Sequence, residues 1–349
     1  MKFKIGQTLV GDNQKCFIVA EMSGNHNGNF NKACEIVRLA KKAGADAIKL
    51  QTYKPSTITL NSKKKDFIIK NKSPWKKKKT FWKLYEEAQT PWEWHPKLFK
   101  LAKKIGIEIF SSPFDETAVD FLEKINCSAY KIASPEINHI PLIEKIAQTK
   151  KPIIISTGLC SKKDINLALQ TIKKYKNNKI IILKCTSSYP ANPEELNLVT
   201  IKDIKKRYNV LSGFSDHTKD DTAALTSVAI GAKVLEKHFK TKNYNSVDDF
   251  FSMDNNDFKT MIKKIRFLEK SLGKIDYNPS KSAKLNHYIG RRSIYVCKPI
   301  KKNEVVTKYN IKIVRPNFGL HPKYYYDIIG KKVNKNLLTG ARFKISYVK

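Results

Sequence analysis

Eight short apolar runs, rich in Ile and Val, alternate with longer segments of helical period over most of this 349-residue chain. The spacing of apolar positions changes from 2 to about 3.6 residues and back, which is typical of strands that alternate with amphipathic helices. Eight strand–helix units in succession predict a closed (β/α)8 TIM barrel, and a doubly wound open sheet is the structural alternative. The expected strands are 17–20, 47–50, 107–110, 129–132, 152–155, 180–183, 210–213 and 234–237.

The segments between these runs predict the helices of the barrel. Gly44, Gly106 and Gly231 follow three of them, and glycine favours the left-handed residue that ends a helix. The segment TPWEWH at 90–95 is either a recognition loop or a helix start with Pro91 in the first turn, and its composition favours the helix start. The expected helices are 31–43, 96–104, 116–124, 140–149, 163–176, 221–231 and 258–272.

The character of the sequence changes after Gly273. Residues 274–290 are largely polar and include Pro279, which is typical of a linker. The remaining segment has short strand-like pieces at 293–296, 311–314 and 343–348. The sequence therefore predicts a barrel domain at 1–273, a linker at 274–290 and a small, mostly β domain at 291–349.

The net charge of the chain is strongly positive. Lys and Arg number 67 against 31 Asp and Glu, which gives a formal charge of +36. Only seven of the cations are Arg, whereas nucleic-acid recognition relies heavily on Arg, and the Lys are spread over the whole chain. The densest Lys cluster, 76–79, follows Trp75 in what we expect to be a surface loop. We predict no nucleic-acid partner, and we expect the charge to attract an anionic small substrate.

Hydropathy and cysteine usage indicate the cellular compartment of the protein. No run approaches the roughly 18–20 apolar residues of a membrane span. The six Cys are scattered without a CxxC pair, which favours reduced thiols over disulfides or a structural zinc site. We predict a cytoplasmic protein with no membrane partner.

Polar side chains follow every predicted strand. In a (β/α)8 barrel these positions lie at the mouth, where the loops after the strands form the active site. Lys49 and Lys131 are suited to bind a phosphate or carboxylate as point charges. Further donors come from the hydroxyl groups of Ser112, Ser134, Ser156 and Ser215. The set predicts a site for an anion.

Two histidines and three carboxylates follow strands of the same barrel. His217 and His238 lie on consecutive strands and can converge on one divalent cation. Proton transfer or binding of sugar hydroxyls is the predicted role of Glu21, Glu136 and Asp248. Taken singly, a buried Lys is more often an ion-pair partner and a His more often a core residue, but the joint occurrence favours one pocket. Cys185 has no evident base beside it and is interpreted as a small buried side chain.

These motifs, in this order, resemble the sialic acid synthase family, whose members condense phosphoenolpyruvate with an amino-sugar aldehyde. The motifs are AEMSGNHNG at 20–28, KLQT at 49–52, YKIASPE at 130–136, ISTG at 155–158, CTSSYP at 185–190, FSDHT at 214–218 and EKHF at 236–239. The C-terminal segment resembles an antifreeze-like (SAF) domain. The segment 84–95 and the Glu-Met-Ser at 21–23 look like the pseudaminic acid synthase branch, because the neuraminate and legionaminate branches usually have Glu-Ile-Gly there.

The resemblance implies a role for each matching residue. Phosphoenolpyruvate would be surrounded by Lys49, Ser112, Lys131, Ser134, Ser156, Ser187, Tyr189 and Ser215. The catalytic set would be Glu21, Glu136, His217, His238 and Asp248, with the two histidines binding Mn²⁺ or Mg²⁺. The sugar would contact Gln51, Tyr189, Asp248 and Arg315, the last of these reaching across a domain-swapped homodimer.

The implied reaction joins phosphoenolpyruvate to 2,4-diacetamido-2,4,6-trideoxy-altrose, with water, and yields pseudaminic acid and phosphate. N-acetylneuraminate or legionaminate synthesis is the alternative within the family, and a non-catalytic carbohydrate- or nucleic-acid-binding protein is a remote one. Three positions depart from the family pattern. Ser112 replaces a common Thr, Ser187 replaces an Asn, and SVD at 246–248 replaces Gly-Pro-Asp, so that either Asp248 or Asp249 is the functional carboxylate.

Overall fold

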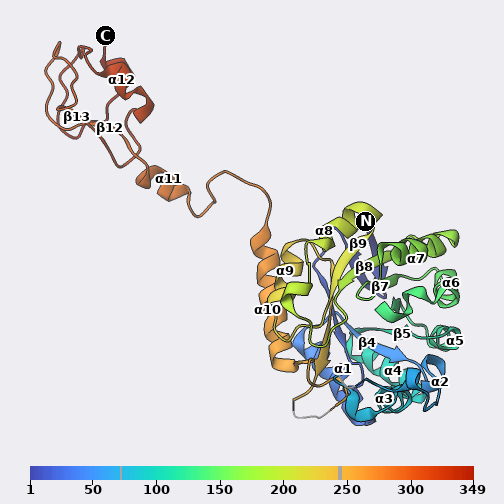
Figure 1. Ribbon diagram of the computed structural model, residues 1–349. Coiled ribbons are helices and arrows are strands. Elements are labelled where there is room, and N and C mark those ends of the chain that lie inside the picture. Colours follow the sequence, from blue (N-terminus) through green and yellow to red (C-terminus); the bar gives the residue numbers. More distant parts are fainter. Residues whose placement is uncertain (71–72, 243–245) are drawn as a thin grey trace. The chain divides into compact units, whose positions relative to one another are not determined.

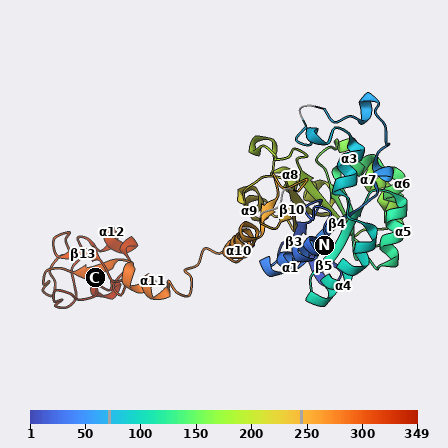
Figure 2. The same ribbon diagram turned by 90° about the horizontal axis from the view of Figure 1, so that it is seen from below.

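A computed structural model describes residues 1–70, 73–242 and 246–349 of the chain. The chain divides into two compact units, Met1–Gly273 and Lys274–Lys349. Figure 1 and Figure 2 show both units.

The first unit is a closed barrel of eight parallel strands surrounded by helices (Figure 1). Strand β10 pairs in parallel with both β3 and β9, so the sheet has no open edge there. All eight predicted strands are present, and the closure rules out the doubly wound alternative. The strands are β3 (Phe17–Glu21), β4 (Ala47–Thr52), β5 (Glu108–Pro113), β6 (Tyr130–Ile132), β7 (Ile153–Ser156), β8 (Ile180–Cys185), β9 (Leu211–Asp216) and β10 (Val234–Lys240).

The helices of the barrel agree with the predicted segments and add one. Gly44 and Gly106 have φ of +97° and +71°, so the left-handed helix ends expected of glycine are confirmed. Helix α8 was not predicted because its sequence, TIKDIKKRY, buries only two apolar side chains. The helices are α1 (Phe30–Ala43), α4 (His95–Ile105), α5 (Glu116–Lys124), α6 (Ile140–Gln148), α7 (Lys162–Lys174), α8 (Thr200–Tyr208), α9 (Thr222–Ala229) and α10 (Asn255–Leu272).

Three features of the barrel unit were not predicted. An antiparallel hairpin of β1 (Lys2–Ile5) and β2 (Thr8–Gly11) precedes the barrel. Strand β11 (Met253–Asp254) pairs with the end of β10. A long crossover between β4 and β5 contains α2 (Pro55–Ile58) and α3 (Phe81–Ala88) before α4 begins.

The Trp-rich and Lys-rich segments both lie in this crossover. The segment predicted as a helix start forms a 3-10 helix, Trp92–Trp94, which continues into α4 at His95. Pro91 precedes the 3-10 turn instead of standing in the first turn of an α-helix. The Lys cluster, which we expected in a surface loop, contains a 3-10 turn, Lys76–Lys78, with no buried residue.

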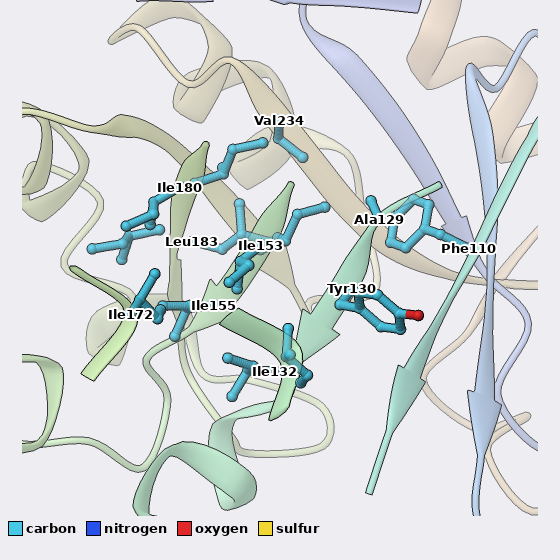
Figure 3. Close-up of a cluster of buried hydrophobic side chains, with 14 of the residues drawn as sticks. Phe110, Ala129, Tyr130, Ile132, Ile153, Ile155, Ile172, Ile180, Leu183 and Val234 are labelled. Atoms are coloured by element: carbon cyan, nitrogen blue, oxygen red, sulfur yellow. The ribbon is translucent and has the colours of Figure 1, made fainter. Parts of the chain in front are cut away.

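The apolar core follows the alternation of side chains along the strands. Lys131 of β6 lines a cavity, whereas its neighbours Tyr130 and Ile132 belong to a buried apolar cluster. In strand β7, Ser156 lines the cavity, whereas Ile153, Ile154 and Ile155 belong to the same cluster, part of which Figure 3 shows. Polar groups therefore reach the barrel interior from strands that are otherwise held by apolar packing.

The second unit has its own small core, which includes Ile294, Val306 and Phe343. Its elements are α11 (Lys284–Gly290), β12 (Ser293–Val296), β13 (Ile311–Val314) and α12 (Tyr325–Ile328), with β12 and β13 antiparallel. The predicted linker thus contains a helix at its end.

The strand predicted at 343–348 is wrong. A 3-10 helix, Ile345–Tyr347, occupies this segment. Phe343 is fully buried but Ile345 is 48% exposed, so the alternating apolar residues do not share one covered face.

All six cysteines are free, as expected for reduced thiols. Among the described residues, no helix combines the length and apolarity needed to cross a bilayer.

Candidate active site

A cavity of about 580 Å³ opens where the barrel strands end. Its lining combines polar side chains from the strand ends with an apolar wall from the β4–β5 crossover and the segment after β10. Twelve of the predicted site residues line it: Glu21, Gln51, Lys49, Lys131, Ser134, Glu136, Ser156, Tyr189, Ser215, His217, His238 and Asp248. Ser112 and Ser187, which belong to the same unit, do not.

Two lysines and two glutamates form a buried network in this cavity. The Nζ of Lys49 lies 2.7 Å from Oε2 of Glu21, and the Nζ of Lys131 lies 2.9 Å from Oε1 of Glu236. Lys49 is also 3.6 Å from Glu236, and all four side chains are at most 5% exposed. Although burial disfavours the charged carboxylate, Lys131 and Lys49 outweigh it and lower the pKa of Glu236 to about 2.

When all four side chains are ionised, their charges cancel, and because burial raises the pKa of Glu21, uptake of one proton there would leave a single net positive charge. A multiply charged anion placed beside these lysines adds uncompensated negative charge to a site of low dielectric constant. A cation bound together with the anion removes this cost. The arrangement therefore favours an anion that enters with a divalent cation.

Glu236 is a central residue of the site that we did not predict as functional. It stands two positions before His238 on β10, and side chains two apart in a strand point to the same face. In the EKHF motif this alternation places Glu236 on the same face as His238, so it could have identified Glu236 from the sequence.

The serine hydroxyls differ in their surroundings. The buried Oγ of Ser156 has no hydrogen-bond partner, so it is available to a ligand. Ser134 Oγ accepts from the N–H of Gly158 at 2.8 Å, and Ser215 Oγ donates to Glu236 at 3.3 Å. Ser112 instead accepts a hydrogen bond from Nζ of Lys49 at 3.3 Å, so it contacts this lysine without being part of the cavity lining.

Ser187 packs closely against Gly158. A Cβ atom on Gly158 would stand 2.1 Å from Ser187 Oγ, so the close approach of the two loops requires glycine at that position. The predicted contact of Ser187 with phosphoenolpyruvate has no support from its position outside the cavity lining.

His217 and His238 come together as predicted, with ring centroids 5.4 Å apart. His217 Nδ1 donates to the backbone carbonyl of Thr186 at 2.8 Å, so Nε2 has the lone pair when the ring is neutral. Although burial lowers the pKa of His217, the neighbouring Cys185 raises it. The Sγ of Cys185 lies 3.9 Å from His217 Nδ1, so the prediction that this cysteine has no base beside it is wrong. The buried Nδ1 of His238 has no partner, and burial holds the pKa of this imidazole well below its usual value. A neutral imidazole with an open nitrogen is the form that binds a metal.

The donor set suits a cation that keeps open positions. Among the described residues, no three His, Cys, Asp or Glu side chains are grouped to hold a metal ion by themselves. Two imidazoles would therefore bind the cation together with water and substrate oxygens, which fits Mn²⁺ better than Mg²⁺ because Mg²⁺ prefers oxygen ligands.

The carboxylates Glu136 and Asp248 face the same cavity. Burial raises the pKa of Glu136 to about 7, and its Oε2 has no hydrogen-bond partner. A carboxyl group with a pKa near neutrality can both accept and return a proton. Asp248 lines the cavity, whereas Asp249 forms an ion pair with Lys240 at 2.7 Å, so the geometry favours Asp248 as the functional carboxylate.

The apolar wall was not predicted from the sequence. Trp75 donates from Nε1 to the carbonyl of Val247 at 2.9 Å, which joins the crossover to the segment after β10. Its ring centroid lies 5.5 Å from that of Tyr189. The wall consists of Tyr53, Ile58, Trp75, Phe81, Leu84, Tyr85, Ala88, Phe114, Val247 and Phe251.

Arg315 belongs to the second unit, directly after β13. It is exposed, and within the described ranges of the chain it makes no hydrogen bond or ion pair.

The comparisons with known proteins agree with this geometry. Pseudaminic acid synthase from Campylobacter jejuni is 44% identical over 334 residues, which cover 95% of this chain and 96% of that protein. N,N'-diacetyllegionaminic acid synthase from Legionella pneumophila is 34% identical, with 95% and 94% covered. The crystal structure of N-acetylneuraminic acid synthetase from Leptospira borgpetersenii matches with a TM-score of 0.72 at 29% identity, covering 82% of this chain and 95% of that one.

Two family models match the chain in the predicted order. The SAF domain matches residues 291–343, which includes β12 and β13. The model for the barrel matches residues 36–277, which contain most of the cavity lining. With the barrel, the strand-end residues and the relatives in agreement, the chain belongs to the NeuB family.

Proposed function

We propose that this chain is a pseudaminic acid synthase. It would condense phosphoenolpyruvate with 2,4-diacetamido-2,4,6-trideoxy-altrose and water, and release pseudaminic acid and phosphate. The chain shares more identity with a pseudaminic acid synthase than with the legionaminic relative. The structural observation that carries the proposal is one cavity that combines a region of lysines and hydroxyl groups with an apolar wall.

The polar region suits phosphoenolpyruvate. Lys49 and Lys131 supply charge for its phosphate and carboxylate, and the unpartnered hydroxyl of Ser156 supplies a further donor. A divalent cation held by His217 and His238 would act as a Lewis acid that polarises the aldehyde oxygen of the sugar.

The chemistry forms one carbon–carbon bond and one bond between C2 and the water oxygen, and it breaks the bond between C2 and the phosphate oxygen. One proton of the water goes to the aldehyde oxygen, and the other leaves the C2 hydroxyl as phosphate departs. C3 of phosphoenolpyruvate attacks the aldehyde carbon, and water adds at C2, which has become electron-poor. The bond between C2 and the phosphate oxygen then breaks, which leaves a keto group and inorganic phosphate. Glu136 Oε2 is suited to take the proton of the attacking water, because its pKa lies near 7.

The apolar wall suits methyl groups of the sugar. A 6-deoxy sugar with two acetamido groups presents three methyls, which gain by leaving water for a wall of aromatic and aliphatic side chains. A hydroxymethyl group placed against Phe81 or Leu84 loses hydration without a hydrogen bond in return.

Side-by-side assays of phosphate release test the proposed function. We expect the altrose precursor to exceed N-acetylmannosamine in kcat/KM by roughly 10- to 200-fold, the discrimination that an apolar pocket provides for small groups. The legionaminate precursor serves as the third substrate and tests the choice of epimer. Equal or higher kcat/KM with either competitor, or no phosphate release with the altrose sugar, contradicts the proposal.

We also propose a homodimer in which Arg315 completes the active site of the partner chain. Arg315 is exposed and unpaired within the part of the chain that the structure describes, and its unit also exposes Tyr288, Ile289 and Phe318 at 46–55%. Apolar groups of this size on a small unit favour coverage by another surface. The six free cysteines support a reducing compartment, and we propose the cytoplasm.

Mixing two inactive variants tests the exchange of domains. Lys49→Ala removes a charge in the cavity, and Arg315→Ala removes the proposed contact from the partner. In a mixed dimer with exchanged domains, one site has both defects and the other has neither, so random mixing should restore about a quarter of wild-type activity. Each variant alone is the control. Confirmed subunit exchange without restored activity would show that Arg315 acts within its own chain.

A further inference from the structure

Ser23 occupies an unusual backbone position at the edge of the cavity. It follows β3, is 3% exposed and lines the cavity. Its φ is +46°, in the left-handed region that costs free energy for a residue with a Cβ atom and none for glycine. A serine that retains this conformation in a buried site must gain something from its hydroxyl group.

The hydroxyl of Ser23 joins two predicted sugar-binding side chains. It hydrogen-bonds to Oδ2 of Asp248, and it accepts from Nε2 of Gln51 at 3.2 Å. A carboxylate only accepts, so the single proton of Ser23 goes to Asp248 and its oxygen is left to receive the amide of Gln51.

The same amide nitrogen also donates to Oε1 of Glu21 at 2.9 Å. Gln51 thus has its nitrogen turned toward Glu21 and Ser23, which leaves its carbonyl oxygen as the remaining polar atom. Since Glu21 also pairs with Lys49 at 2.7 Å, one chain of contacts runs from the anion-binding lysine to Asp248.

The backbone around Ser23 is held by other contacts. Asn25 Nδ2 donates to Ser252 Oγ at 2.8 Å and to the carbonyl of Phe239 at 3.0 Å. Ser246 Oγ donates to Asn25 Oδ1 at 2.6 Å, and Ser252 Oγ donates to the carbonyl of Asp248 at 2.6 Å. Removing the Ser23 hydroxyl therefore breaks the direct link between Asp248 and Gln51 while both loops stay anchored, and among the described residues it leaves the Gln51 side chain held through Glu21 alone.

We propose that Ser23 is a positioning residue that sets the orientation of Gln51 and Asp248 and thereby the selectivity for the sugar. The inference rests on the proposed function, because it takes these two side chains to face the sugar. Both present acceptors, a carboxylate and an amide carbonyl, so the groups they recognise are donors: hydroxyl O–H and acetamido N–H.

Two variants separate positioning from folding. Ser23→Gly removes the hydroxyl but also relieves the left-handed strain, which offsets part of the lost hydrogen bond, so it should be the more stable of the two variants. Ser23→Ala removes the hydroxyl but keeps the Cβ atom, so it should be the less stable of the two. Both should raise KM for the sugar about tenfold or more, the loss expected for a hydrogen bond to a charged group, while KM for phosphoenolpyruvate stays unchanged.

Asn27→Gly is the matched control. Asn27 lies in the same loop with φ of +50°, is exposed and lies outside the cavity lining, so this change relieves similar strain without touching Gln51 or Asp248. Its KM values and its ratio of kcat/KM between sugars should remain those of the wild type.

A crystal structure of ligand-free Ser23→Gly gives a result that does not depend on the sugar. We expect the side chains of Gln51 and Asp248 to lose their single orientation while the loop at 22–28 keeps its path. Wild-type orientations there, or a wild-type KM for the sugar in Ser23→Gly, would overturn the inference. An equal rise of both KM values would also overturn it, because it would indicate a general structural role. Failure of the wild type to use any of the three sugars contradicts the proposed function instead, and the crystal structure still decides the role of Ser23.

Discussion

Removal of divalent metal from the purified protein is expected to lower phosphate release by about a thousandfold or more, since Lewis-acid stabilisation contributes several kcal/mol to a transition state. Addition of Mn²⁺ should restore the activity. His217→Ala and His238→Ala should each weaken metal binding, because these two imidazoles, which lie near each other at the ends of adjacent strands, are the ligands that we propose. Activity and metal content, measured on the same samples, check the prediction.

His139→Asn is a suitable control for the histidine variants. His139 caps helix α6 through its side chain and is not part of the cavity lining, and Asn is also a good helix cap. This variant should keep its metal and its activity. Undiminished turnover in protein shown to be free of metal would exclude the Lewis-acid role.

Replacement of Glu236 is expected to have the second large effect. Glu236→Ala leaves Lys131 buried without its nearest carboxylate, which should destabilise the fold by about 3–5 kcal/mol. Glu236→Gln keeps the shape of the side chain and should lower kcat/KM by roughly a hundredfold, because Lys131 loses the carboxylate that pairs with it and Lys49 loses one of its two. Urea denaturation and phosphate-release kinetics measure the two effects.

The double variant Lys131→Met with Glu236→Gln separates stability from function. A buried ion pair can be replaced by neutral side chains of similar size at little cost, so the stability should return close to that of the wild type. Activity should not return, because the cation that binds the anionic substrate is missing. Recovered activity in this double variant would show that the charge network only supports the fold.

Much of the barrel and its site could be predicted because both depend on short-range patterns. Strands such as β7 (Ile153–Ser156) are buried along their whole length, so their sequences are continuous apolar runs. Polar residues at their ends stand out against these runs, which is how Lys131, Ser156 and His217 could be found. Glu236 could have been found by the same pattern, since it alternates with His238 on β10.

Other parts of the site depend on contacts between distant segments. The apolar wall forms because Trp75, in the β4–β5 crossover, hydrogen-bonds to Val247 beyond β10, 172 positions later. Ser112 stands at a strand end like the other serines, yet its hydroxyl contacts Lys49 and does not line the cavity. In the second unit, the alternation at 343–348 predicted a strand that has no regular partner.

Local sequence determines the periodicity of apolar residues, and this periodicity predicts the order of strands and helices and their closure into a barrel. Because parallel strands end at the same edge, it also predicts the cluster of charged residues there. Tertiary contacts decide which of two neighbouring carboxylates reaches the cavity. Asp249 forms an ion pair with Lys240, and Asp248 lines the cavity. They also explain the left-handed backbone of Ser23, because its hydroxyl can hydrogen-bond to Gln51 and Asp248 only when the fold brings both side chains beside it. A hydrogen bond between residues 225 positions apart leaves no periodic trace in a sequence, because it depends on the closed barrel that brings its partners together.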